Sequence, residues 1–187
     1  MHTTYTGQLV RIRPFRSADE LALVAVHESN RPNNHWGYWQ WAAREAHNQF
    51  DKAGMLATDA YSTFAIDRLD SGELVGYEEY GPVKPGHLST WLGTGIFREH
   101  WSNGFGREAK LLVLCYLFEN FRLHTVFADT TATHTRAQAG LEAIGMRKVG
   151  ERRCAHWFKG RYVGVPQYQI LRSEWEAMDY RQTVQRG

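Results

Sequence analysis

The feature that most constrains the fold is a strand, a tight turn and a long helix that follow one another in residues 88–118. The turn leads into Gly104-Phe105-Gly106, where the helix begins. Glycines here let successive backbone N–H groups converge on one point, and a helix N-terminus adds a partial positive charge. The turn is therefore suited to an anionic pyrophosphate, with a plain tight turn as the alternative interpretation. It lacks the Gly-Lys-Ser/Thr of a Walker loop and the third glycine of a dinucleotide fingerprint.

The helix and the strand of this unit each have a clear pattern. Apolar residues recur at three- and four-residue spacing between Gly106 and Phe118, which is typical of a buried helix. The strand Leu88–Phe97 contains Gly93 and Gly95. Interior strand glycines indicate a bulge or the close approach of a ligand.

Shorter β-type runs and amphipathic helices flank this unit on both sides. In chain order we expect a strand at Val10–Ile12, helices at 17–27 and Trp39–Ala53, a hairpin at Thr63–Ile66 and Leu74–Tyr77, a strand at Val126–Thr130, a helix at Thr133–Ile144, and closing strands at Arg147–Arg153 and Val163–Leu171. This order predicts a mixed α/β (α+β) fold, with parallel strands only around the helix 106–118.

Composition limits the remaining choices. The chain has 187 residues, 43% of them hydrophobic, and no linker or repeat, so we expect a single domain over 1–187. A net charge of +2 argues against nucleic acid as a partner. Two cysteines give no disulfide framework, and neither a signal pattern nor a membrane-length apolar run is present. We therefore expect a cytoplasmic protein with no membrane partner and no metal.

Three segments carry a resemblance to a known family. Phe97–Ala109 resembles the acetyl-CoA loop of the GNAT N-acetyltransferase superfamily, and Trp101 with Glu108-Ala109 is similar to its RimJ/RimL-type branch. Leu141–Met146 and Tyr168–Trp175 are similar to that branch's second helix and last strand. In matching order, the resemblance covers roughly Val10 to Trp175. It implies a mostly antiparallel twisted sheet with a central, splayed parallel strand pair, flanked by helices.

The resemblance also implies acetyl-CoA as the cofactor. Its pantetheine arm would lie between the strand 88–97 and Val126–Thr130, and would pair with backbone groups of the first strand. The turn would take the pyrophosphate. The residues implied to bind the cofactor are Gly95, Ile96, Phe97, Trp101, Ser102, Asn103, Gly104, Phe105, Gly106, Arg107 and His134.

The chain departs from the family at its usual general acid. His134 and Ala137 stand where many relatives carry Asn-x-x-Ser, and Leu141 stands at a common tyrosine position. His134 is a candidate replacement for the acid, with a role in lining the cofactor as the alternative. Glu78 and Glu79 are candidates to accept the amine's proton through water, and strand alternation lets only one of them face the site.

The acceptor wall implied by the resemblance consists of His35, Trp36, Tyr38 and Trp39, and Trp91 is a further candidate to bind the substrate. An aromatic cluster of this kind can equally be core or an oligomer contact. Cys115 lies in an apolar run without a paired base, which argues against an acyl-carrying nucleophile.

Three functions remain open at this point. The first is direct transfer of an acetyl group from acetyl-CoA to a primary amine in a ternary complex, the amine being a protein N-terminus, a polyamine-like metabolite or an aminated antibiotic. The second is a catalytically degenerate acyl-CoA-binding module, suggested by Ala137 and Leu141. The third is RNA association through the basic run 147–161, for which a solvated strand face is the favoured interpretation. The sequence is compatible with both a monomer and a homodimer.

Overall fold

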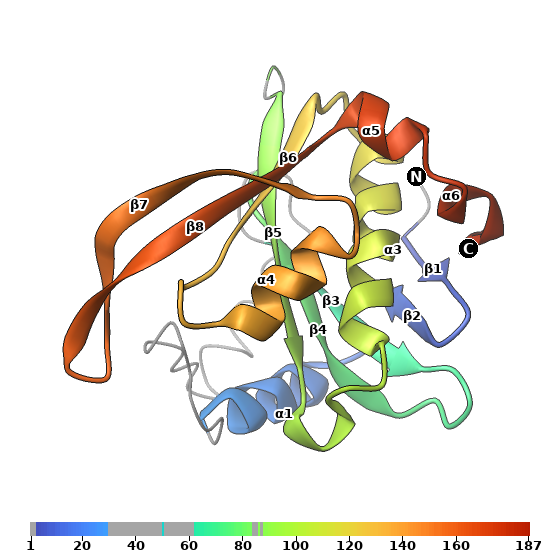
Figure 1. Cartoon of the computed structure of the whole chain (residues 1–187). Helices are drawn as coiled ribbons and strands as arrows, with labels where there is room; N and C mark the ends of the chain where they lie inside the picture. The colour runs from blue at the N-terminus through green and yellow to red at the C-terminus, as the bar shows by residue number, and fades with distance from the viewer. Residues whose placement is uncertain (1–2, 30–49, 51–61, 84–85, 87) are drawn as a thin grey trace.

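A nine-stranded sheet forms the framework of the part of the chain that the computed structural model describes, residues 3–29, 50, 62–83, 86 and 88–187. The sheet order is β7-β8-β6-β5-β4-β3-β2-β1-β9 (Figure 1). The strands are β1 Tyr5–Thr6, β2 Val10–Arg13, β3 Ser62–Arg68, β4 Leu74–Tyr80, β5 Ser89–Ile96, β6 Thr125–Asp129, β7 Arg147–Phe158, β8 Arg161–Leu171 and β9 Gln185–Arg186. The helices are α1 Ala18–Ser29, the 3-10 helix η1 Arg98–His100, α3 Phe105–Asn120, α4 Thr135–Glu142, α5 Arg172–Glu176 and α6 Tyr180–Thr183. The helix expected at Trp39–Ala53 lies outside the described residues except for Phe50.

The strands β5 and β6 form the parallel pair of this sheet, and the other strand pairs in the described part are antiparallel. Pairing between β5 and β6 is limited to Ser89–Trp91 with Thr125–Phe127. Beyond these residues β5 continues along β4, whereas β6 continues along β8. The two strands therefore diverge, which confirms the expected mixed sheet with a splayed parallel pair.

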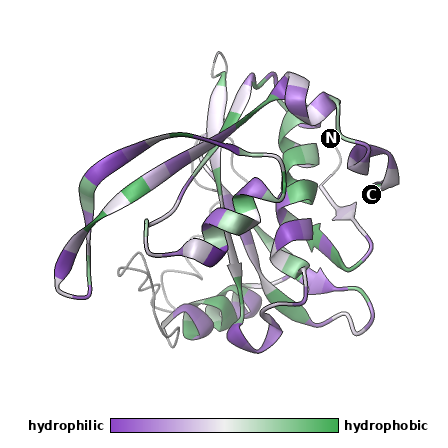
Figure 2. Ribbon diagram, in the orientation of Figure 1, coloured by the Kyte–Doolittle hydropathy of each residue, from purple (hydrophilic) through white to green (hydrophobic). Residues whose placement is uncertain are grey.

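The helix α3 covers one face of the sheet, as its apolar spacing predicts. Leu112, Val113 and Leu117 are fully buried and share one core with Val126 and Ile170 from the sheet. The hydrophobic colour of Figure 2 accordingly runs along α3, while the β7–β8 hairpin that projects from the body is largely hydrophilic. The helix α4 lies beside α3 (Figure 1).

The helix α1 packs on the opposite face. Its Leu21 and Val24 form a smaller core with Ala65, Tyr77 and Phe97. Ala65 lies between Phe64 and Ile66 of β3, and both of these neighbours belong to the α3 core. Because successive strand residues point to opposite faces, α1 and α3 sandwich the sheet.

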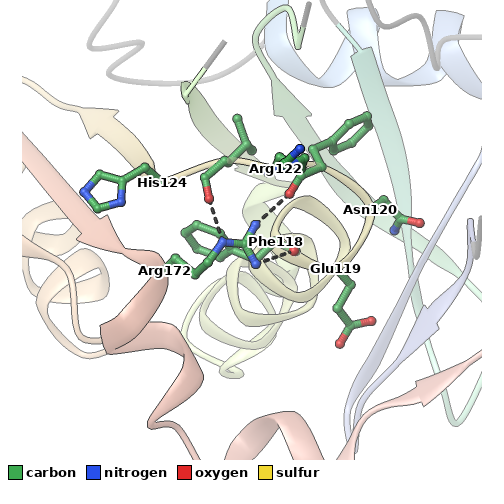
Figure 3. A pocket seen from close by; sticks show the side chains of 8 residues that line it. Phe118, Glu119, Asn120, Arg122, His124 and Arg172 are labelled. Atoms are coloured by element: carbon green, nitrogen blue, oxygen red, sulfur yellow. Dashed lines mark hydrogen bonds between the residues drawn. The ribbon is translucent and has the colours of Figure 1, made fainter. Parts of the chain in front are cut away.

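Two polar anchors fix α3 near its ends. At the first turn, the buried carboxylate of Glu108 accepts hydrogen bonds from the amides of Gln8, Leu9 and Val10, at 2.8, 2.7 and 2.8 Å. At the other end, the guanidinium of Arg172 donates to the carbonyl oxygens of Phe118 in the last turn of the helix and of Phe121 and Leu123 just after it (Figure 3). Unsatisfied carbonyls at a helix C-terminus are stabilised by a cation of this kind. Glu108 thus ties the start of α3 to the β1–β2 turn, and Arg172 holds the end of the helix.

The closing hairpin is longer than the sequence pattern predicts. β7 runs to Phe158 rather than to Arg153, and β8 begins at Arg161 rather than at Val163. Most β7 side chains are exposed, so the strand has no alternation to mark its end. Three of its four lysines and arginines pair with acids, Arg147 with Glu174, Lys148 with Glu151 and Arg152 with Asp129. These ion pairs support the interpretation of the basic run as a solvated face.

Among the described residues, no helix is both long enough and apolar enough to cross a membrane.

Candidate active site

The turn between β5 and α3 presents a row of backbone amides. Ser102 and Gly104 have positive φ angles of 68° and 83°, which turn the chain back toward the helix that begins at Phe105. Gly104 adopts this conformation without the steric cost that a Cβ brings. None of the described residues accepts a hydrogen bond from the amides of residues 102–106. These donors lie at the positive end of a 16-residue helix, where an anion is stabilised.

Side chains of the turn hold its shape. The indole Nε1 of Trp101 donates to the carbonyl oxygen of Ile96 at 2.7 Å, and the amide of Asn103 donates to the carbonyl of His100 at 3.1 Å. A Cβ on Gly106 would lie 3.1 Å from Cγ1 of Ile96, so this glycine keeps α3 close to β5. The backbone amides, rather than these side chains, are therefore the donors that the turn offers to a ligand.

The structure gives the glycines of β5 a role that the sequence did not suggest. The pairing of β4 with β5 shows no register shift, so the bulge suggested by Gly93 and Gly95 is absent. Instead, Tyr77 lies over Gly95 and Glu79 lies over Gly93, where an added Cβ would be 2.1 Å and 2.7 Å from their side-chain atoms. The glycines make room for side chains of the neighbouring strand.

The open edge of β5 faces the gap that the divergence from β6 creates. Phe97 donates its amide to Val75, and Gly81 donates to Trp91, so odd-numbered β5 residues bond toward β4. By the alternation of an antiparallel ladder, Leu92, Thr94 and Ile96 direct their backbone groups toward the gap. Of Gly95, Ile96 and Phe97, whose backbone we expected to pair with pantetheine, Ile96 directs its backbone groups toward the gap, and Gly95 and Phe97 direct theirs toward β4. The residue pattern could not reveal this, because it depends on which strand is the partner.

The adjacent carboxyls Glu78 and Glu79 point to opposite faces, as strand alternation predicts. Glu79 lies over Gly93, on the same face as Tyr77 and Trp91. Burial, with a further contribution from the charge of Glu28, raises the pKa of Glu79 to about 7. The carboxyl is therefore divided between its acid and its carboxylate near neutral pH, which suits a general base.

Glu78 is fully buried on the face that α3 covers. Its Oε1 accepts a hydrogen bond from Thr94 Oγ1 at 2.8 Å. Burial raises the pKa of Glu78 to about 8, against the opposing effect of Lys110. At neutral pH this carboxyl is therefore mostly protonated, so it is poorly suited to accept a proton.

His134 precedes the first turn of α4. Its carbonyl oxygen accepts the amides of Ala137 and Gln138, and its Nδ1 lies 3.5 Å from Thr130 Oγ1. Two residues further on, Arg136 stacks over the Trp101 ring, so the start of α4 lies against the turn. His134 is thus on the β6 side of the gap, opposite β5. Sequence reasoning missed Arg136, because a polar residue in a first helical turn gives no sign of its partner.

Trp91 is the candidate substrate-binding residue that the structure describes. It forms the last β5–β6 pair, with Phe127, and its ring lies over Gly81. Trp91 therefore stands where the gap begins, on the face of Glu79. The expected wall residues His35, Trp36, Tyr38 and Trp39 lie outside the described residues.

Two other features are separate from this arrangement. Cys115 is buried in α3, and burial raises the pKa of its thiol to about 11, which leaves no thiolate for nucleophilic chemistry near neutral pH. A surface pocket at the far end of α3 is lined by residues such as Arg122 and His124, and the guanidinium of Arg172 occupies part of it (Figure 3). That pocket is at the opposite end of the helix from the amide-lined turn.

Comparisons with known proteins agree with this geometry. The family model for the acetyltransferase (GNAT) domain matches residues 10–147. The N-acetyltransferase p20 of Bacillus licheniformis is 24% identical over 112 residues, which are 60% of this chain and 63% of that protein. The N-acetyltransferase YoaA of Bacillus subtilis is 27% identical over 109 residues, 58% of this chain and 62% of that protein. The matched part thus spans less than two thirds of either relative.

Solved structures share the fold. A GNAT-family acetyltransferase from Bacillus anthracis has a TM-score of 0.76 at 20% identity, and the match covers 92% of this chain and 100% of that one. A spermidine N-acetyltransferase from Vibrio cholerae, in complex with CoA and spermine, has a TM-score of 0.78 at 20% identity, with 90% and 98% covered.

Proposed function

The chain belongs to the GNAT acetyltransferase family, and from this premise we propose that it transfers an acetyl group from acetyl-CoA to a primary amine in a ternary complex. The observation that carries the proposal is the divergence of β5 from β6 directly before an amide-lined turn at the start of α3. The pattern at Trp101 and Glu108-Ala109 favours the RimJ/RimL-like branch of the family.

The donor set fits the chemical groups of CoA. Phosphate oxygens need N–H donors, and residues 102–106 offer theirs at a helix N-terminus. The amides of a pantetheine arm need strand-like partners, and Leu92, Thr94 and Ile96 direct backbone groups into the gap. When bound, acetyl-CoA supplies an acetyl group activated as a thioester.

The residues of the chain then have separate roles. As the new C–N bond forms and the C–S bond breaks, the amine must lose a proton, and the carboxylate of Glu79 accepts it directly or through water. Trp91, at the start of the gap, bounds the acceptor on the same face. We assign His134 to the opposite side of the gap, where its imidazole would contact the pantetheine arm or protonate the leaving sulfur.

A catalytically degenerate acyl-CoA-binding module is the second candidate. It is favoured by Ala137 and Leu141, which stand at positions where many relatives carry a hydroxyl group. Leu141 is buried in the core beside α3, so it offers nothing to a leaving thiolate. Thiols titrate near pH ~8.5, however, so a thiolate leaves with little assistance. The presence of Glu79 therefore favours the transferase more strongly than the lack of a hydroxyl favours the binding module.

The deciding experiment measures release of CoA thiol from acetyl-CoA across an amine library that includes peptides with free N-termini, with a no-acceptor control. We expect release that depends on at least one amine and that falls in Glu79→Gln. Binding of CoA without acetyl transfer to any amine would instead identify the binding module. Failure to bind CoA at all would rule out both functions.

A further inference from the structure

The two sides of the gap meet again at a contact between Arg136 and Trp101. Trp101 belongs to the turn that follows β5, and Arg136 belongs to the first turn of α4, which follows β6. The guanidinium carbon Cζ of Arg136 lies 3.8 Å from the centroid of the Trp101 ring. The strands that diverge after Trp91 and Phe127 are thus bridged by side chains at the outer end of the gap.

The platform under Arg136 is fixed in place. The indole of Trp101 is held by its hydrogen bond to the carbonyl of Ile96, and the Trp101 amide donates to Arg98 at 3.2 Å. A ring anchored at both its backbone and its Nε1 has little freedom to rotate. A guanidinium stacked on it is therefore held in one orientation.

Stacking engages the face of a guanidinium, whose N–H groups lie in its plane. This geometry suits phosphate, which accepts two parallel hydrogen bonds from an arginine. The ring that carries the guanidinium belongs to the residue directly before Ser102, the first of the residues whose amides the turn presents. The site for an anion therefore combines backbone amides from one side of the gap with a cation from the other.

The surrounding charges favour an anion at this place. Arg107 and Lys110 lie in the first turns of α3, and Lys110 Nζ donates to the carbonyl of Gly106. The acid in this part of the helix, Glu108, directs its carboxylate away from the turn, to the amides of Gln8–Val10.

We propose that Arg136 is a cofactor-binding residue, whose guanidinium, held on Trp101, binds phosphate oxygens of CoA. The inference rests on the proposed function, since it assigns a further residue to the same cofactor. Arg136 closes the gap over the cofactor by joining α4 to the turn. The phosphate is either the pyrophosphate or the adenosine 3′-phosphate, which are chemically alike at this site.

The test is isothermal titration of the purified protein with CoA and with dephospho-CoA, which lacks the 3′-phosphate. We expect Arg136→Ala and Arg136→Gln to raise the Kd for CoA about tenfold or more, because a charge-assisted bidentate contact is lost. Arg136→Lys keeps the charge without the planar stack, so its Kd should lie between those of the wild type and Arg136→Ala. A loss confined to CoA identifies the 3′-phosphate, and an equal loss with dephospho-CoA identifies the pyrophosphate.

Arg122→Ala is the matched control, because it removes an exposed arginine at the far end of α3. Its Kd for CoA should stay within about twofold of the wild-type value, as expected for a distant surface charge. Equal weakening in Arg122→Ala, or an unchanged Kd in all Arg136 variants with normal melting temperatures, would overturn the inference. Wild-type protein that binds no CoA would refute the proposed function, and the role of Arg136 with it.

Discussion

At the scale of single residues, Glu79 carries the acid-base chemistry of the proposal. Its pKa of about 7 means that the carboxylate fraction, and with it the rate constant kcat/KM, should rise with pH through neutrality. Glu79→Gln cannot accept a proton, so we expect kcat to fall roughly 10²-fold and the acidic limb of the pH profile near 7 to disappear. Steady-state kinetics from pH 5.5 to 8.5, in about half-unit steps, measure both effects.

The neighbouring residue provides the control for this prediction. Glu78→Gln changes the same type of side chain on the opposite face of β4, so it should keep the acidic limb that Glu79→Gln loses. If the acidic limb of the pH profile is still present in Glu79→Gln, or is absent in Glu78→Gln, the base is not Glu79.

Glu78 has a predicted effect on stability instead. Its pKa is about 8 in the folded protein against an ordinary value of 4.5, so the folded state binds the proton more tightly than the unfolded chain. The resulting contribution to the free energy of unfolding is fully present below pH 4.5 and is lost as the pH rises to about 8. Glutamine resembles the protonated acid and can still accept the Thr94 hydrogen bond. Glu78→Gln should therefore gain stability relative to wild type across this window, by an amount on the order of a few kcal/mol.

Urea unfolding of both proteins at several pH values from 4.5 to 8 measures this difference. A constant difference in unfolding free energy across the window would mean that Glu78 is ionised in the folded protein.

A substitution at His134 can distinguish its two candidate roles, which are contact with the pantetheine arm and protonation of the leaving sulfur. If the imidazole only lines the pantetheine arm, as we expect, His134→Ala should weaken acyl-CoA binding and leave turnover at saturation unchanged. The reason is that a leaving thiolate needs little protonation. Titration with CoA, together with kcat at saturating acetyl-CoA, distinguishes the cases. A turnover loss of roughly 10²-fold at unchanged affinity would make His134 the catalytic acid.

At the scale of elements, the turn before α3 depends on two glycines for different reasons. Gly104 has a φ of 83°, which a β-branched residue adopts only with strain, whereas Gly106 faces Ile96 across a contact of 3.1 Å. Gly104→Val and Gly106→Val should each raise the Kd for acyl-CoA at least about tenfold, or ~1.4 kcal/mol, by displacing the backbone amides. Isothermal titration with CoA gives the measurement.

Gly160→Val is a control for the backbone strain alone. Gly160 also has a positive φ, of 80°, but it lies in the β7–β8 turn with nothing near its added Cβ. This variant should keep the wild-type Kd. An unchanged Kd in correctly folded Gly104→Val and Gly106→Val would remove the turn from the binding site.

The elements themselves were largely predictable, because their signals are local. The three- and four-residue spacing of Ala109, Leu112 and Tyr116 marked α3, and the glycines marked the turn before it. Gly93 and Gly95 were interpreted as a bulge or the approach of a ligand, whereas the side chains that lie over them, Glu79 and Tyr77, depend on the β4–β5 register. Register is a non-local property that residue patterns specify only weakly.

Contacts between distant segments could not be predicted from the sequence either, because they also depend on non-local packing. Glu108 bonds to amides about 100 residues earlier in the chain, and Arg136 stacks on a ring 35 residues away. Neither residue type is unusual at its position in a helix. Their roles follow from the packing of α3 against the β1–β2 turn and of α4 against the loop.

At the scale of the whole molecule, the sheet consists of two parts joined at the β5–β6 pairs. One part contains β9 and β1–β5, the other contains β6–β8, and three residue pairs connect them. The core around α3 draws side chains from both parts, with Ile12 and Phe64 from the first and Val126 and Ile170 from the second. We therefore expect the two parts to unfold together as one cooperative unit.

A ligand bound in the gap would contact both parts and stabilise this unit. At a CoA concentration of 100 times Kd, binding to the folded state alone adds about 2.7 kcal/mol to the free energy of unfolding. For a chain of this size, that corresponds to a rise in Tm of roughly 5–10 °C. Differential scanning calorimetry should show a single transition that moves upward with CoA, and a much smaller shift in Gly106→Val. Two transitions, with only one of them moved by CoA, would mean that the two parts of the sheet unfold separately and that CoA contacts only one.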